Sequence, residues 1–369
     1  MLAQTPTFLI EQSMKTLKLG EMFCGPGGLA VGAELANTVA REFGYEFKHA
    51  WAVDNHQQTI DTYVANIRGA TQQSAICADV RHTKASDLLK ISKIDGFAYG
   101  FPCNDFSLVG EHKGISGEYG PLYSYGLPVL ELSKPLFFIA ENVGGIRSAN
   151  EGKAFHKILE DLQSTGNGYI ITPHLYKFED YGVPQARHRV IIVGIRKDLK
   201  KVFRPPAPTH INSHNTCFEA ITNPPIPENA PNHELTRQSA QVIERLRHIR
   251  PGENAWTASL PDDLRLNVSK TKISQIYKRL DPNKPSYTVT GSGGGGTHVY
   301  HWEEPRALTN RERARLQTFP DTFIFSGNKE SVRRQIGMAV PPDGAKLIFE
   351  AVVKTLSGIS YDYVESNIT

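Results

Sequence analysis

Short apolar runs alternate with stretches of helical periodicity over the first 200 residues of this chain. The runs predict six strands, at Leu17–Met22, Phe47–Val53, Ser74–Ala78, Ile94–Tyr99, Leu136–Ala140 and Val190–Ile195. Apolar residues recur at helical spacing in Leu29–Phe43, Gln57–Ile67 and Gly152–Leu162. This alternation is typical of a sheet with helices on both faces. The sequence therefore predicts an α/β fold, a Rossmann-like, doubly wound, mostly parallel sheet.

Two proline-rich segments interrupt this alternation. They are Arg204–Pro208 and Asn223–Pro227, and their proline density precludes regular secondary structure. We therefore expect a domain boundary there. A third unusual segment, Gly291–Gly296, is explained equally well as a flexible linker or as a loop that brings its backbone close to phosphates.

The net charge is +3, but the charged residues are unevenly distributed along the chain. Residues 233–334 hold 17 Lys or Arg and 11 Asp or Glu, a local excess of +6 that leaves −3 for the remainder of the chain. A basic segment joined to an acidic one is expected of a nucleic-acid-binding protein with a separate catalytic core. A solvated helical surface would explain the same charge.

The cysteines and the apolar pattern narrow the class of protein further. Cys24, Cys77, Cys103 and Cys217 include no Cys-x-x-Cys pair, so the sequence predicts neither a metal site nor a disulfide framework. The first 15 residues lack a continuous apolar segment, and no long apolar run follows them. We therefore expect a cytoplasmic protein without a membrane partner.

A glycine-rich loop, Phe23–Leu29, follows the first predicted strand and opens the first predicted helix. Free N–H groups at a helix start favour a negatively charged or carboxylate-bearing ligand. Gly25, Gly27 and Ala30 also satisfy the loose dinucleotide pattern G-x-G-x-x-A. The loop alone therefore predicts a nucleoside cofactor, and it leaves a dinucleotide and S-adenosylmethionine equally open.

Two aspartates end the next strands. Asp54 closes the second predicted strand, where its carboxylate can accept hydrogen bonds from both ribose hydroxyls. Asp79 closes the third, where it can meet an adenine amino group. An ordinary polar strand end is the alternative for each.

A cysteine and a glutamate follow two further predicted strands. Cys103 comes after Pro102, and Glu141 ends a strongly apolar run. Ligands bind beyond the carboxyl ends of parallel strands, so both side chains are expected to face one crevice. A thiolate is intrinsically very nucleophilic, and a desolvated carboxyl tends to keep its proton. The pair suits covalent attack on an electron-poor ring, although an isolated cysteine is more often a small buried hydrophobe.

Taken together and in order, the motifs resemble those of the DNA (cytosine-5)-methyltransferases, in particular the bacterial restriction-modification enzymes. The matching segments are Phe23–Gly28, Pro102–Ser107, Glu141–Val143, Gln185–Arg189, Arg306–Thr309, Gln317–Pro320 and Gln335–Pro342. They span about Lys18 to Ile348, and their joint occurrence makes a nicotinamide dehydrogenase a remote alternative.

The resemblance implies S-adenosyl-L-methionine as the cofactor and no metal. The residues implied to bind it are Phe23, Gly25, Gly27, Gly28, Leu29, Asp54, Asn55, Asp79, Val80, Pro102, Met338 and Val340. Met338 stands where many relatives have asparagine, which leaves one cofactor-side hydrogen bond open. Asn104 stands where most relatives have glutamine, which implies a rearranged contact.

The resemblance also assigns the chemistry. Cys103 is expected to add to C6 of cytosine, and Glu141 to contact N3 and the exocyclic amine. Arg187 and Arg189 are expected to hold the base and the Cys103 loop, with phosphate contact or a surface ion pair as the alternative. Since C5 and C6 of a stacked base cannot be reached, the cytosine must leave the duplex.

The resemblance implies two domains. Residues 1–204, completed by 326–369, are expected to form the catalytic and cofactor-binding domain, and 205–325 a small target-recognition domain whose base-reading residues lie within 210–284. The expected partners are double-stranded DNA and a cognate restriction endonuclease, and the protein is expected to be a monomer. A transfer RNA methyltransferase and a catalytically silent DNA-binding regulator remain alternatives.

Overall fold

The computed structural model describes residues 14–102, 120–266, 274–294 and 296–368. Within these residues, seven strands form one sheet in the order β3-β2-β1-β4-β5-β8-β6. The strands are β1 (Lys15–Met22), β2 (Tyr45–Asp54), β3 (Ala75–Cys77), β4 (Gly96–Tyr99), β5 (Phe137–Val143), β6 (Tyr169–Lys177) and β8 (His188–Arg196). All pairs from β3 to β5 are parallel, which confirms the predicted mostly parallel α/β fold.

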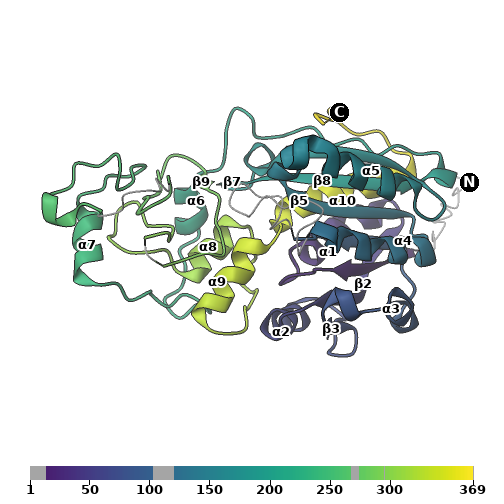
Figure 1. Ribbon diagram of the computed structural model, residues 1–369, viewed down its shortest axis with the longest axis horizontal. Coiled ribbons are helices and arrows are strands. Elements are labelled where there is room, and N and C mark those ends of the chain that lie inside the picture. The colour runs from purple at the N-terminus through teal and green to yellow at the C-terminus, as the bar shows by residue number, and fades with distance from the viewer. Residues whose placement is uncertain (1–13, 103–119, 267–273, 295, 369) are drawn as a thin grey trace, which may run out of the picture.

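Helices cover both faces of the sheet (Figure 1). One face packs on α1 (Gly28–Glu42) and α10 (Pro342–Ser357). The other packs on α3 (Ala85–Ile91), α4 (Leu127–Ser133) and α5 (Lys153–Ser164). α2 (Gln57–Asn66) lies next to β2 and β3. No helix in the described part of the chain is both long enough and apolar enough to cross a membrane.

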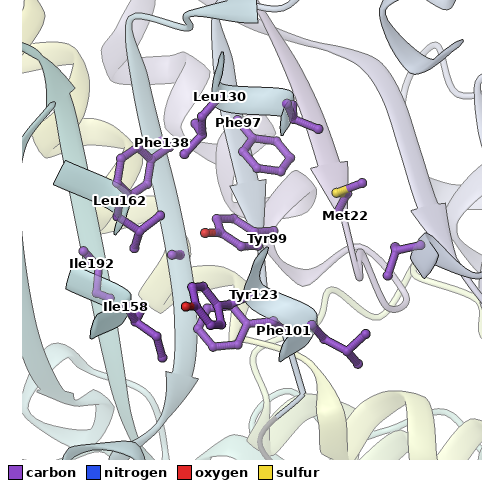
Figure 2. Packing of buried hydrophobic residues seen from close by; sticks show 14 of the residues in the cluster. Met22, Phe97, Tyr99, Phe101, Tyr123, Leu130, Phe138, Ile158, Leu162 and Ile192 are labelled. Carbon is purple, nitrogen blue, oxygen red and sulfur yellow. The ribbon is translucent and has the colours of Figure 1, made fainter. Parts of the chain in front are cut away.

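A row of aromatic rings fixes the exit of β4. Phe97, Tyr99 and Phe101 lie on one side of the chain because successive side chains of a strand point to opposite faces. Their ring centroids are 4.8 and 5.5 Å apart, and Tyr123 continues the row at 6.0 Å from Phe101 (Figure 2). The packing of these rings fixes the position of the backbone that leads into Pro102.

One strand runs against the others. β8 is antiparallel to both of its neighbours, β5 and β6. Its first residues therefore lie at the edge of the sheet where the parallel strands end. This reversal carries Arg189 to the carboxyl end of β5, where Val143 is its register partner.

The residues that the structure describes between 205 and 325 contain little regular structure. They hold α6 (Cys217–Thr222), α7 (Ala240–Arg247), α8 (Asn310–Leu316) and β9 (Ser286–Tyr287), which pairs with β7 (Gln185–Ala186). α9 (Lys329–Met338) follows and packs on α8. Figure 1 shows α6, α7 and α8 at one end of the molecule and the seven-stranded sheet at the other. The short 3-10 helices in the described ranges are Val80–His82, Gly120–Gly126, Gly144–Gly152, Phe178–Tyr181, Lys197–Leu199 and Asp262–Leu264.

Several arginines of this region are internal. Five arginines are no more than 8% exposed, namely Arg245, Arg279, Arg311, Arg313 and Arg315. Arg279 donates to the backbone carbonyls of Leu246, Ile249, His301 and Glu304. Buried loop carbonyls need a donor that regular structure would otherwise supply. Part of the local positive charge thus has a structural role, whereas other basic residues of the region, such as Arg237, Arg247 and Arg250, are exposed.

Candidate active site

A cavity of about 420 Å³ lies at the carboxyl edge of the parallel strands. The predicted site residues that line it are Phe23, Gly25, Gly28, Leu29, Asp54, Asn55, Asp79, Val80, Pro102, Glu141, Arg187, Arg189, Met338 and Val340. Gly27 does not line the cavity. The predicted nucleophile, Cys103, and its neighbour Asn104 lie outside the described residues.

The glycine loop adopts a conformation that its sequence explains. Phe23, Gly25 and Gly27 have φ angles of 54°, 54° and 101°. Such angles favour glycine, and at a non-glycine residue they cost of order 1–3 kcal/mol and cluster at functional sites. A Cβ on Gly28 would lie 2.2 Å from the carbonyl oxygen of Val340. Gly28 therefore allows the backbone of Val340, in the Gln335–Pro342 motif, to lie against the glycine loop.

Asp54 is oriented by two backbone amides. Gly25 N donates to Oδ2 at 3.1 Å and His56 N donates to Oδ1 at 3.2 Å. Burial raises the pKa of Asp54, while the two amides and nearby positive charge oppose the rise. The carboxylate is thus held at one end of the cavity and joined directly to the glycine loop.

Asp79 already has a partner. Arg81 contacts its carboxylate through Nε at 3.0 Å and Nη2 at 2.7 Å, and the backbone amide of Arg81 donates at 2.9 Å. The hydrogen bonds from Arg81 lower the pKa of Asp79. The contact with an adenine amino group stays a prediction, because a carboxylate has further lone pairs for a second donor.

Glu141 and Arg189 form an ion pair across neighbouring strands. Arg189 Nε lies 3.0 Å from Glu141 Oε1, and the two side chains are 14% and 12% exposed. Glu141 faces Ile191 in the register, so Arg189 is its diagonal neighbour on the same face. Burial raises the pKa of Glu141, and Arg189 and Arg187 oppose that rise. Desolvation therefore favours the protonated form of Glu141, and the two neighbouring arginines favour its charged form.

The exit of β4 lies beside this pair. A Cβ on Gly100 would fall 3.1 Å from Glu141 Oε2, so glycine allows the backbone to approach the carboxyl closely. Asn142 Nδ2 donates to the Phe101 carbonyl at 3.1 Å and ties β5 to the same turn. Pro102, which covalently precedes Cys103, lines the cavity. Asn142 lies within the Glu141–Val143 motif, but no role for its side chain could be predicted from the sequence.

Arg187 joins distant parts of the chain behind the cavity. Its buried guanidinium donates to the carbonyls of Val289 at 3.3 Å and Gly337 at 3.0 Å. Burial lowers the pKa of Arg187, and the neighbouring Arg189 lowers it further. The third donor, Nε, is buried without a partner in the described part of the chain.

Two buried glutamines, Gln185 and Gln317, connect the same parts of the chain as Arg187. No role was predicted for either side chain from the sequence. Gln185 Nε2 donates to Gln317 Oε1 at 2.9 Å, and Gln185 Oε1 accepts from the Val289 amide at 2.8 Å. Gln317 Nε2 donates to the carbonyls of Ile336 and Ala339. Both glutamines are fully buried. They therefore fix β7, α8 and the end of α9 to one another.

The fold and the cavity define an α/β enzyme that binds a nucleoside cofactor next to a carboxyl–guanidinium pair. Comparison with known proteins gives the family. The sequence profile of the C-5 cytosine-specific DNA methylases matches residues 17–354. The Type II methyltransferase M.BbvI of Brevibacillus brevis is 61% identical over 351 residues, which cover 94% of this chain and 93% of that protein.

Two further comparisons agree. The Type II methyltransferase M.NgoFVII of Neisseria gonorrhoeae is 38% identical over 363 residues, covering 96% of this chain and 91% of that protein. The crystal structure of a putative DNA modification methyltransferase encoded within an E. coli prophage superposes with a TM-score of 0.68 at 25% identity, covering 92% of this chain and 99% of that chain.

This chain belongs to the C-5 cytosine-specific DNA methylase family. It is a DNA (cytosine-5)-methyltransferase with S-adenosyl-L-methionine as its cofactor. The recognised resemblance and the predicted enzyme class are thereby confirmed, and the dehydrogenase alternative is excluded.

The cavity fits this cofactor. Its volume falls within the usual range of small-molecule sites, about 300–1,000 Å³. A Cβ placed on Gly25 would meet no atom within 4 Å, so the loop leaves open space there. Asp54 supplies an acceptor at that end, and apolar residues such as Leu29 and Val80 line the walls.

Proposed function

We propose that this chain methylates one cytosine within a specific double-stranded DNA sequence through a covalent adduct between Cys103 and C6. The observation that carries the proposal is the Glu141–Arg189 pair, 3.0 Å apart in the cavity that Pro102 also lines. Such a pair presents hydrogen-bonding groups to a planar ring in a site shielded from water.

Each step has a residue to perform it. The Cys103 thiolate forms a bond to C6, and the electron pair of the C5–C6 double bond then makes C5 nucleophilic. Glu141 donates to or shares a proton with N3 and so stabilises the charge that develops on the ring. Arg189 holds Glu141 in place. C5 would then bond to the methyl carbon that the bound cofactor supplies, and the sulfonium sulfur would keep the electron pair of the broken carbon–sulfur bond. Loss of the C5 proton to a base then re-forms the C5–C6 double bond and expels the Cys103 thiolate.

The cofactor is proposed to lie between the glycine loop and the final motif. Asp54 would accept from the ribose hydroxyls, Asp79 would meet the adenine amino group, and Phe23, Asn55 and Val80 would enclose the nucleoside. The remaining proposed contacts are Gly25, Gly27, Gly28, Leu29, Pro102, Met338 and Val340. When bound, S-adenosylmethionine supplies an electrophilic methyl group on a sulfonium. Gly27 would contribute indirectly, by allowing the backbone conformation of the glycine loop.

Met338 changes one contact of this pocket. Its side chain is 64% exposed and lines the cavity at the end of α9. A thioether is only a weak acceptor, so it would replace an asparagine hydrogen bond with apolar contact.

We also propose that the methylation protects DNA from a cognate restriction endonuclease. The support is the similarity to Type II methyltransferases, M.BbvI among them. The domain division at 204–205 and 325–326, a monomeric state and a cytoplasmic location beside the chromosome belong to the same proposal.

Labelled S-adenosylmethionine tests the substrate. Transfer to duplex DNA, with bisulfite sequencing to locate the modified cytosine, is the expected result. Transfer to transfer RNA alone would overturn the DNA substrate, and binding of duplex DNA without any transfer would favour a silent regulator.

A further inference from the structure

A row of buried polar side chains lies next to the glycine loop. Glu21 is 1% exposed near the end of β1, two positions before Phe23. Tyr63 Oη, on α2, donates to Glu21 Oε1 at 2.5 Å, and His49 Nδ1 lies 3.2 Å from the same hydroxyl. Burial lowers the pKa of His49 to about 4, so its imidazole is neutral at pH 7. The row therefore supplies no positive charge to pair with Glu21.

Tyr63 also packs against the glycine loop itself. A Cβ on Gly27 would fall 3.1 Å from Tyr63 Cδ2 and 3.0 Å from Ile67 Cδ1, so both side chains lie directly against the loop backbone. Gly27 has a φ angle of 101°, and its amide donates to the Cys24 carbonyl at 3.2 Å. The tyrosine that donates to Glu21 therefore also supports the turn from the loop into α1.

The surroundings of Glu21 disfavour its charged form. Burial raises its pKa to about 8 against the hydrogen bond from Tyr63, and the charge of Glu34, on α1, adds to the rise. Glu21 Oε2 is buried without a hydrogen-bond partner in the described part of the chain. Burial raises the pKa of the Cys24 thiol, and Asp54 and Glu21 raise it further, so this neighbour is neutral as well. At pH 7 the Glu21 carboxyl is therefore mostly protonated.

The space around Glu21 offers little compensation for a charge. A cavity of about 10 Å³ adjoins its side chain and is also lined by Lys48 and His49 of β2. A cavity needs about 10–15 Å³ to hold one water molecule. Lys48, the cation of this lining, pairs with Glu46 at 2.8 Å and its side chain is 57% exposed. An ionised Glu21 would therefore stay unpaired unless the packing around it opened and admitted more water.

We propose that Glu21 and Tyr63 are positioning residues for the cofactor: the neutral carboxyl keeps the Tyr63 ring packed against Gly27, and a charged carboxyl releases the glycine loop. The inference rests on the proposed placement of S-adenosylmethionine at this loop. Neither Glu21 nor Tyr63 lines the cavity of about 420 Å³, so both act through the loop backbone. The affinity for the cofactor should consequently depend on the protonation of a carboxyl that does not touch it.

The first test is the dissociation constant of S-adenosylmethionine at pH 7 and pH 9, measured by titration calorimetry for wild type and Glu21→Gln. If the binding form carries a proton on Glu21, the apparent affinity follows the protonated fraction. Between the two pH values wild type should therefore lose about 10-fold more affinity than Glu21→Gln. Both proteins meet the same ligand, so ionisation of its amino group cancels in the comparison. Equal pH dependence of the two proteins would overturn the proposal.

The second test, Tyr63→Phe, separates this mechanism from a general loss of packing. The substitution keeps the ring against Gly27 and removes the hydrogen bond that opposes the rise in the pKa of Glu21. That pKa should rise further, so the loss of cofactor affinity should begin at a higher pH than in wild type. An onset at the wild-type pH or below it, or a loss of equal size at every pH, would contradict the role of this hydrogen bond.

Glu350→Gln is the matched control. Burial also raises the pKa of Glu350, which lies on α10, pairs with Lys346 at 3.8 Å and does not line the cavity. Its substitution should leave the wild-type pH dependence in place. Near-ultraviolet circular dichroism at pH 9 verifies that each protein remains folded during the titrations.

Asp54→Asn tests the placement of the cofactor separately. Wild-type affinity in that variant would refute the placement at the glycine loop. Weakened binding by Asp54→Asn, together with equal pH responses of wild type and Glu21→Gln, would refute the positioning role of Glu21 and leave the placement intact.

Discussion

Glu141 Oε1 and Arg189 Nε lie 3.0 Å apart because β8 runs antiparallel to β5 and returns its first residues to the edge where β5 ends. A parallel β8 would have carried Arg189 to the opposite edge of the sheet. The reversed strand thus supplies the cation that the buried carboxyl needs.

Replacing Glu141 by glutamine should lower kcat for methyl transfer by about 10²- to 10³-fold, the usual effect of removing one group that stabilises transition-state charge. DNA and cofactor affinity should change little. Steady-state rates with labelled cofactor measure the effect, and Glu160→Gln, on the exposed side of α5, is the control. A variant with near-normal kcat would remove Glu141 from the chemistry.

Replacing Arg189 by methionine should shift the pH dependence of kcat. Arg189 favours the charged form of Glu141, so its loss raises the pKa of Glu141. If the protonated carboxyl is the working form, the alkaline limb of the kcat profile moves to higher pH while the maximum falls. Arg196→Met, at the other end of β8 and paired with Asp198, should leave the profile in place. A shift of that limb to lower pH contradicts the assignment.

The substitution Asp54→Asn should weaken cofactor binding by about 10- to 100-fold, since hydrogen bonds to a charged group contribute about 1.5–3 kcal/mol. Asparagine also presents an NH2 group to one of the two backbone amides that Asp54 accepts from. Titration calorimetry with S-adenosylmethionine measures the loss. Asp61→Asn on α2 should bind normally, and equal affinity in both variants would exclude Asp54 from the pocket.

Stability should fall with rising pH because of Glu21. This residue of β1 is 1% exposed, accepts from Tyr63 Oη at 2.5 Å, and has a pKa raised to about 8 by burial. A carboxyl whose pKa is raised on folding stabilises the protein below its unfolded pKa, near 4.5, and that contribution is lost as the pH rises through 8.

Glu21→Gln should therefore raise the free energy of unfolding at pH 9 by roughly 2–4 kcal/mol relative to wild type and have little effect at pH 4.5. Urea unfolding at the two pH values checks this. The same difference at both pH values would show that the ionisation of Glu21 is not the cause.

The buried strands could be predicted because each is an apolar run covered on both faces. The runs at 17–22 and 190–195 correspond to β1 and β8. β6 was missed for the opposite reason. It is an edge strand, most of its residues are only partly buried, and it includes Pro173, which a central strand would exclude.

The direction of β8 could not be predicted from the sequence. Nor could the hydrogen bonds that connect β7, α8 and α9 beside the cavity. Apolar content does not encode strand direction. The hydrogen bonds of Arg187 join residues 102 and 150 positions away, and no local pattern signals such partners. Asp54, Asp79 and Glu141 could be foreseen because strand ends converge at this edge. The arginines and the residues of the last motif could be named only from the family resemblance, and the partners that hold them could not be foreseen.

Trapping on duplex DNA that contains 5-fluorocytosine tests the central claim most directly. Fluorine at C5 cannot leave as a proton, so the last step is blocked after Cys103 has bonded to C6. The account predicts a complex that survives denaturation and whose digested peptide carries the nucleotide on Cys103, with none formed by Cys103→Ser. An active wild-type enzyme that gives no such adduct would contradict it.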